Sequence, residues 1–330
     1  MLHLPNRPRR NRQNPALRNL IEETKLHAHD FIAPLFVHAK DTSEAIEAMP
    51  GCSRFSLDDL VKECGELVAL DIQGVILFPA IAEKLKTSCA SECCNPDGLI
   101  PQAIKAIKAQ YPQLLVLTDI ALDPYNADGH DGIVSTDKNG NLTILNDDTV
   151  ATLCKQALCH AQAGADIVAP SDMMDGRIGE IRTALDTQGY QDIAIMAYTA
   201  KYASAYYGPF RGALESAPKS GDKKTYQMNP ANTSEAFREL ALDQAENADI
   251  LMVKPAGSYL DIIYQYRQQS NLPIAAYQVS GEYLMIEAGS AAGWLDKDKL
   301  IEESLLSIKR AGAHIIVSYY AKYMAQILQK

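Results

Sequence analysis

Short apolar runs recur eight times along the chain and alternate with segments of helical pattern. The runs are rich in Val, Ile, Leu and Ala and are bounded by turn residues, as is typical of strands buried on both faces. They cover residues 31–37, 74–80, 114–120, 164–171, 193–201, 249–254, 273–280 and 313–320. Apolar residues with helical spacing predict helices at 56–72, 99–110, 147–163, 176–188, 233–247, 258–269 and 299–310.

This alternation has no break in composition and predicts one (β/α)8 TIM barrel over residues 31–330, preceded by an arm over 1–30. The alternative is a doubly wound open sheet. We favour the barrel because no glycine fingerprint follows the first strand and because eight strands suit closure. Two long loops, 121–146 and 202–232, follow carboxyl ends of strands, where such barrels place their chemistry.

Composition narrows the class of protein. The 330 residues are 47% hydrophobic, and the net charge of −10 argues against a nucleic-acid partner. No apolar run approaches the ~18 residues of a membrane span, so we expect no membrane partner. There is no secretory pattern, and we interpret the seven cysteines as reduced thiols, so we expect a cytoplasmic protein. Cys89, Cys93 and Cys94 share one loop, where free thiols are favoured over a metal site.

The N-terminal arm is the exception to the acidic balance. It has no acidic residue before Glu22 and contains Arg7, Arg9, Arg10, Arg12 and Arg18. Three interpretations stay open from these residues: a nucleic-acid arm, an organelle transit peptide, or a segment that binds a neighbouring subunit.

Two of the predicted strands end in a lysine, Lys201 and Lys254. A buried ammonium group is costly unless its charge is paired or lost, and two ammonium groups in one pocket lower each other's pKa. A shift from ~10.4 to about 7 needs ~4 kcal/mol and yields the neutral amine that attacks a carbonyl. The alternative is that each lysine extends to solvent.

The loop 202–226 is called the lid below. It mixes Gly and Pro with aromatic and basic residues, which suits closure over an anionic substrate. The alternative is an ordinary surface loop.

Four motifs resemble the porphobilinogen synthase (5-aminolaevulinate dehydratase) family, and the resemblance covers nearly the whole chain. They are Met252–Ala256, Ala200–Ser204 with Tyr207–Arg211, Ala169–Arg177 and Tyr277–Tyr283. The family is a group of lyases that join two molecules of 5-aminolaevulinate into a pyrrole with loss of two waters, early in tetrapyrrole and haem biosynthesis. The resemblance implies the same substrate, two molecules per site, for this chain.

The resemblance also implies roles for individual residues. Lys254 would form a Schiff base with the substrate of the propionate side, and Lys201 with that of the acetate side. Asp119 would orient a lysine or move protons. One substrate carboxylate would be held by Arg211, Lys223 and Gln227, and the other by Ser280 and Tyr319.

Ala121, Asp123 and Asp131 stand where the zinc-dependent branch of the family has three cysteines. Hard carboxylate oxygens disfavour zinc and suit Mg²⁺ or no tightly held metal. The loop therefore resembles the aspartate-rich, zinc-independent bacterial branch, and we expect no active-site zinc, with Asp123 and Asp131 as at most weak ligands.

Glu246 matches the glutamate that binds an allosteric Mg²⁺ in many bacterial members, although an exposed glutamate at a helix end is the alternative.

In the family that this chain resembles, the N-terminal arm wraps a neighbouring barrel in a homo-octamer. This resemblance selects the subunit-binding interpretation of the arm.

Two other functions compete with this one. A Schiff-base aldolase needs one lysine, so two lysines and two carboxylate-binding sets argue against it. A catalytically inactive barrel serving as an assembly subunit is disfavoured by the intact lysines.

Overall fold

The computed structural model describes residues 4–329 except 215 and 216, and leaves the side chain of Arg211 undescribed. Eight parallel strands lie in the order β12-β11-β10-β9-β8-β5-β4-β1, and pairing of β12 with β1 closes the barrel. The strands are β1 (Phe31–His38), β4 (Gly74–Ala80), β5 (Leu115–Ile120), β8 (Ile167–Pro170), β9 (Ala194–Lys201), β10 (Ile250–Lys254), β11 (Ile274–Gln278) and β12 (Ile315–Ser318). The predicted barrel and each of its strands are confirmed.

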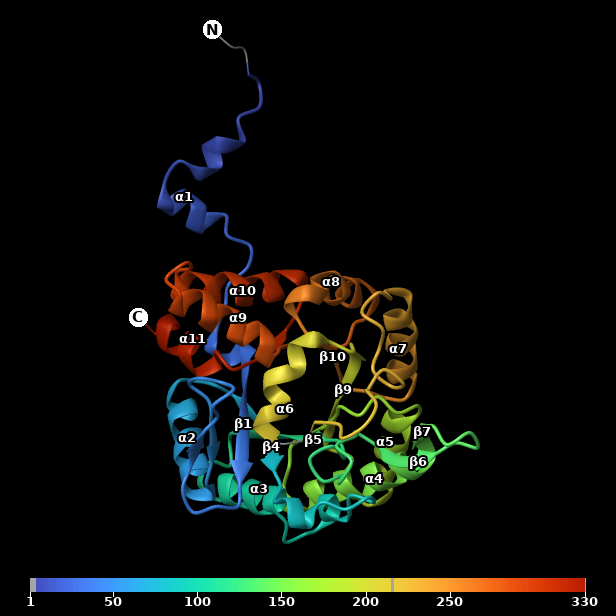
Figure 1. Ribbon diagram of the computed structural model, residues 1–330. Helices are drawn as coiled ribbons and strands as arrows, with labels where there is room; N and C mark the ends of the chain where they lie inside the picture. The colour runs from blue at the N-terminus through green and yellow to red at the C-terminus, as the bar shows by residue number, and fades with distance from the viewer. Residues whose placement is uncertain (1–3, 215–216, 330) are drawn as a thin grey trace.

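Helices lie between the strands on the outside of the barrel (Figure 1). Those predicted from spacing are α2 (Leu57–Ala69), α3 (Leu99–Gln110), α4 (Asn146–Ala163), α5 (Arg177–Thr187), α7 (Ser234–Ala245), α8 (Leu260–Gln269) and α10 (Lys297–Ala311). Local chemistry sets their ends. The Ser56 side chain accepts the Asp59 N–H at the start of α2, and Gly164, with φ of 104°, ends α4 in the left-handed region that favours glycine.

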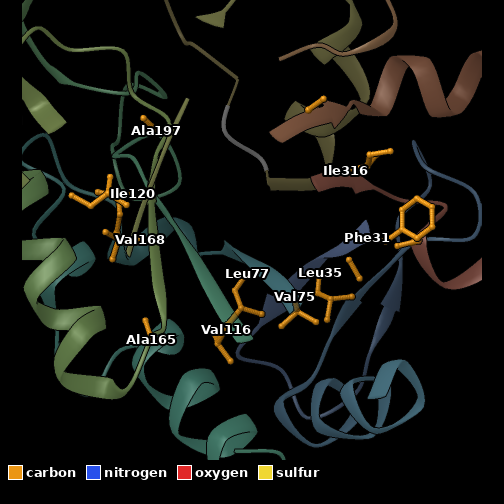
Figure 2. Packing of buried hydrophobic residues seen from close by; sticks show 14 of the residues in the cluster. Phe31, Leu35, Val75, Leu77, Val116, Ile120, Ala165, Val168, Ala197 and Ile316 are labelled. Carbon is orange, nitrogen blue, oxygen red and sulfur yellow. The ribbon is translucent and has the colours of Figure 1, made fainter. Parts of the chain in front are cut away.

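Apolar side chains pack in two layers. One layer fills the barrel interior and includes Phe36, Leu117 and Met252. The other lies between strands and helices, and Figure 2 shows part of it, from Phe31 and Val75 to Ile316. Because both faces of the strands are buried, the near-continuous apolar runs in the sequence are explained.

Several elements were not predicted. The loop 121–146 contains a hairpin of β6 (Ile133–Thr136) and β7 (Leu142–Leu145), and the lid contains η5 (Ala205–Tyr207) and α6 (Gly208–Leu214). Two further helices, α9 (Ser280–Ala291) and α11 (Ala321–Leu328), follow β11 and β12. Residues predicted as the end of the strand 273–280 thus include the start of α9, where the Glu282 carboxylate accepts the Val279 N–H.

The arm leaves the barrel as an extended segment (Figure 1). It includes η1 (Pro8–Arg12) and α1 (Pro15–Leu20), neither of which has a buried residue. Leu20 is 81% exposed, so the described residues cover little of this apolar side chain. Within the described part of the chain, no helix is both long and apolar enough to cross a membrane.

Candidate active site

Two lysines lie side by side at the carboxyl end of the barrel. Lys201 ends β9, Lys254 ends β10, and the two residues are register partners in the parallel pair. Each is only 6% exposed, so neither reaches solvent freely. The alternative in which each lysine extends outward is therefore excluded.

Aromatic rings surround the ammonium of Lys254. Its Nζ lies 4.4 Å from the ring centroid of Tyr277, 5.0 Å from that of Tyr198 and 5.1 Å from that of Phe210. Burial, and then the neighbouring charge of Lys201, lower the pKa of Lys254 to about 7, against the opposing attraction of Asp119. Near neutral pH a large fraction of this amine is therefore uncharged and nucleophilic.

Lys201 has a different, polar environment. Its Nζ donates a hydrogen bond to the carbonyl oxygen of Ser171 and lies 3.7 Å from Oδ2 of Asp131. The Lys201 ammonium therefore has oxygen atoms as its nearest partners, whereas the Lys254 ammonium is surrounded by aromatic rings.

Three aspartates line the same cavity as the lysines. Asp119 lies in β5 next to its end, and Asp123 and Asp131 follow in the long loop. Burial and the charge of Asp123 raise the pKa of Asp119 to about 7, and its Oδ1 has no hydrogen-bond partner in the described structure. A half-protonated carboxyl beside two amines suits proton transfer.

Lys223 extends from the lid into this aspartate pair. Its Nζ lies 3.0 Å from Oδ1 of Asp131 and 3.2 Å from Oδ2 of Asp123, and all three side chains are buried. Burial opposes the charge of Lys223, but the two carboxylates prevail and raise its pKa. Burial likewise opposes the charge of Asp131, yet Lys201 and Lys223 lower its pKa. In this structure Lys223 binds protein carboxylates, which leaves it unavailable to a substrate carboxylate until those contacts break.

Of the other predicted carboxylate-binding residues, Ser280 and Tyr319 are not among those that line this cavity. Gln227 lines it together with both lysines. Ser280 is buried, and its hydroxyl accepts the Phe210 N–H at 3.1 Å. The hydroxyl oxygens of Tyr319 and Tyr277 lie 3.2 Å apart, which places Tyr319 behind the ring that covers Lys254. The predicted role of the Arg211 side chain lies outside the described residues.

The cavity between the lysines is small. Its volume is about 30 Å³, and Phe210 and Tyr207 of the lid line it. Such a volume holds about two water molecules, since each needs roughly 10–15 Å³ by this measure. Two keto acids are larger than this volume, and an open position of the lid stays a prediction. Larger cavities of about 270 and 450 Å³ lie elsewhere, and neither is lined by Lys201 or Lys254.

The side chains predicted as metal ligands do not form one cluster. Among the residues that the structure describes, no three His, Cys, Asp or Glu side chains form a group that could hold a metal ion. Glu246 lies apart from the cavity, at the end of α7, and its Oε2 accepts the Gly179 N–H at 3.1 Å. Asp123 and Asp131 already share an ammonium group, so this oxygen pair does not fit a tightly held zinc.

Sequence reasoning did not single out the rings around Lys254 or the carbonyl of Ser171. The signal for Tyr198 and Tyr277 was available, because alternation along β9 and β11 places both in the barrel interior with Met196 and Ala275. The contact with Ser171 could not be found, since a backbone carbonyl leaves no trace in residue type.

Taken together, the fold and site define an enzyme of the (β/α)8 class with a buried pair of potential Schiff-base lysines. A sequence model of the family described as delta-aminolevulinic acid dehydratase matches residues 5–327. The chain belongs to this family.

Relatives agree over almost the whole length. The delta-aminolevulinic acid dehydratase of Physcomitrium patens is 56% identical over 99% of this chain and 75% of its own, and enzyme 1 of Arabidopsis thaliana is 53% identical over the same shares. The crystal structure of the Toxoplasma gondii ME49 enzyme in complex with its product porphobilinogen has a TM-score of 0.96 and 50% identity, over 99% of this chain and 92% of that one. The expected porphobilinogen synthase, a hydro-lyase, is thus confirmed.

Two expectations need correction. The bacterial branch is not supported, because the plant relatives are named chloroplastic enzymes. Ala121, Asp123 and Asp131 describe the ligand chemistry of one loop and do not identify a lineage. The predicted cytoplasmic location is also wrong, because the same plant relatives are named chloroplastic. The prediction relied on reduced cysteines, which do not distinguish one reducing compartment from another.

Proposed function

We propose that this chain condenses two 5-aminolaevulinate molecules to porphobilinogen through one Schiff base on Lys254 and a second on Lys201. The observation that carries the proposal is the buried lysine pair on adjacent strand ends, because a reaction with two ketones needs two amines in one pocket. Lys254, with its lowered pKa, would react as the free amine with the propionate-side substrate.

Lys201 would react with the acetate-side substrate. The Lys201 amine must lose a proton before attack, and Asp119, which lines the same cavity, is the better acceptor because the pKa of Asp131 is lowered. Asp119, with a pKa raised to about 7, would exchange protons with the bound substrates between the two lysines.

Substrate carboxylates would be held at two places. Gln227, Lys223 and Arg211 would hold one, after Lys223 exchanges the two aspartates for the substrate. Ser280 and Tyr319 would hold the other, behind the ring of Tyr277. The small volume of the cavity supports a lid that opens to admit substrate and closes for reaction.

Metal and assembly remain part of the proposal. Glu246 would hold an allosteric Mg²⁺ through the oxygen that does not accept the Gly179 N–H, with water as the other ligands. No step at the lysines depends on this ion, and we propose that the site works without zinc. The exposed, arginine-rich arm would bind a neighbouring barrel in a homo-octamer.

The test combines activity with covalent trapping. A colour reaction for the pyrrole formed from 5-aminolaevulinate should be positive, and borohydride added with substrate should label Lys254 and Lys201. Lys254→Met should abolish turnover. Peptide maps with label on neither lysine would refute the mechanism.

A further inference from the structure

The Glu282 carboxylate, in the first turn of α9, joins two segments that follow neighbouring strands. Its Oε1 accepts the Gly257 N–H at 2.6 Å, and its Oε2 accepts the Val279 N–H at 2.7 Å. Gly257 lies three residues after Lys254, and Val279 immediately precedes Ser280. The same side chain therefore fixes the backbone beyond Lys254 against the backbone that carries Ser280.

The junction has no spare room. A Cβ atom at Gly257 would lie 2.6 Å from Oε1 of Glu282, and one at Gly281 would lie 2.6 Å from the carbonyl oxygen of Tyr206. Burial raises the pKa of Glu282 to about 7, while the N–H groups of Val279 and Gly257 act in the opposite direction. Each oxygen of the Glu282 carboxyl group thus holds one short hydrogen bond from a backbone N–H.

The lid is attached to the same junction. The Ser280 hydroxyl accepts the Phe210 N–H at 3.1 Å and donates to the Tyr206 carbonyl at 3.3 Å. The Ser258 hydroxyl donates to the Tyr206 hydroxyl at 3.2 Å. The ring of Phe210 in turn covers the Lys254 ammonium. Displacement of the junction would therefore move both the strand end and the ring next to this amine.

Lys201 depends on other contacts. Its ammonium is held by the Ser171 carbonyl and by Asp131, which belong to the β8 and β5 sides of the barrel. A change at Glu282 thus acts directly on the backbone three residues beyond Lys254, whereas the oxygen partners of the Lys201 ammonium lie on other elements.

We propose that Glu282 is a positioning residue for Lys254, and that it fixes the amine of this lysine, and not that of Lys201, against a substrate ketone. The inference rests on the proposed function, from which the reactive role of Lys254 comes. The competing explanation is a helix cap only, since the Glu282 carboxylate accepts the N–H of Val279, the N-cap residue of α9. A cap alone would change stability without distinguishing the two lysines.

The experiment compares labelling of the two lysines in one protein. Laevulinate, a keto acid that cannot condense to a pyrrole, is trapped with borohydride, and peptide mapping gives the rate of labelling at each lysine. In Glu282→Gln only one oxygen remains for two N–H donors. We expect the rate at Lys254 to fall about 10- to 100-fold, as displacement of a reacting group by about 1 Å does, and the rate at Lys201 to stay within about twofold.

Two more variants complete the design. Gly257→Ala places a methyl group 2.6 Å from Oε1 of Glu282, so that the carboxylate must shift, and it should reproduce the selective loss at Lys254. Glu180→Gln removes an exposed carboxylate from the first turn of α5 and should leave both rates unchanged.

The outcomes separate the explanations. Equal losses at both lysines with a lowered melting temperature, or unchanged rates in both junction variants, would overturn the positioning role while the proposed function stands. A wild-type protein labelled on neither lysine would overturn the proposed function, and this inference with it.

Discussion

Lys254 should lose its neutral amine at pH 7 when the charge of Lys201 is removed. Lys201→Met removes the charge, whereas Lys201→Arg keeps a cation at the same strand end without an amine that forms a Schiff base. Both variants should be unable to condense two substrates. Only the methionine variant should change the titration of Lys254.

The size of the effect follows from the site. Lowering the pKa of Lys254 from 10.5 to about 7 corresponds to about 5 kcal/mol, with burial as the larger cause and Lys201 as the next. At an effective dielectric constant of ~20, a cation several ångströms away contributes on the order of 1–3 kcal/mol, or about one to two pKa units. Without it, the ammonium form is favoured and the pKa rises to between about 8 and 9. The neutral fraction at pH 7 then falls from about half to a few per cent.

The assay follows Lys254 alone. Laevulinate labelling with borohydride is measured from about pH 5 to pH 10, which brackets both expected midpoints, and label at Lys254 is quantified by peptide mapping. In Lys201→Arg the midpoint should stay near about 7. Coincident profiles for the two variants would refute the argument, because Lys254 would then owe its low pKa to burial alone.

Four further predictions concern the lid, the arm and the metals. Lys223→Ala should raise KM and lower the free energy of unfolding by about 3 kcal/mol in urea titrations, because Asp123 and Asp131 lose a buried partner; an unchanged KM would exclude substrate binding by Lys223. Deletion of residues 1–14 should leave a folded barrel in smaller assemblies by light scattering, and an unchanged octamer would contradict the role of the arm. Glu246→Ala should remove stimulation by Mg²⁺ while basal activity stays, and stimulation that survives would make Glu246 an ordinary surface residue. Dialysis against a zinc-selective chelator should leave full activity, and one tightly held zinc per site in the purified protein would overturn this expectation.

Much of the barrel could be predicted because its physics is local. Strands buried on both faces appear as continuous apolar runs, and helices that cover them have one apolar face. The helix α9 was missed because Ser280–Ala291 directly continues the apolar run of β11, and its start is set by the Glu282 cap. The hairpin of β6 and β7 lies in a loop whose polar residues gave no strong alternation.

The sequence identified which residues belong to the site, but it did not identify which of them contact one another. Strand ends identified Lys201 and Lys254, because the carboxyl ends of parallel strands meet at one barrel face. The pairing of Lys223 with Asp123 spans 100 residues and depends on how the lid folds back over the loop after β5. Such a contact requires the closed fold, which is why Lys223 was expected on a substrate carboxylate and is found on protein carboxylates.

The contact of Lys223 with Asp123 and Asp131 also explains how the loop 121–146 can do without thiolate ligands and a metal ion. Asp123 and Asp131 bring two negative charges into a buried site, and Lys223 and Lys201 bring two positive ones. The cluster is therefore close to neutral without any ion. Adding a divalent cation would leave two excess positive charges in a medium of low dielectric constant, unless a lysine moved away or lost its proton. The proposed turn of Lys223 toward a substrate carboxylate would take one positive charge away from the two aspartates, and the ammonium group of a second substrate molecule is chemically suited to replace it.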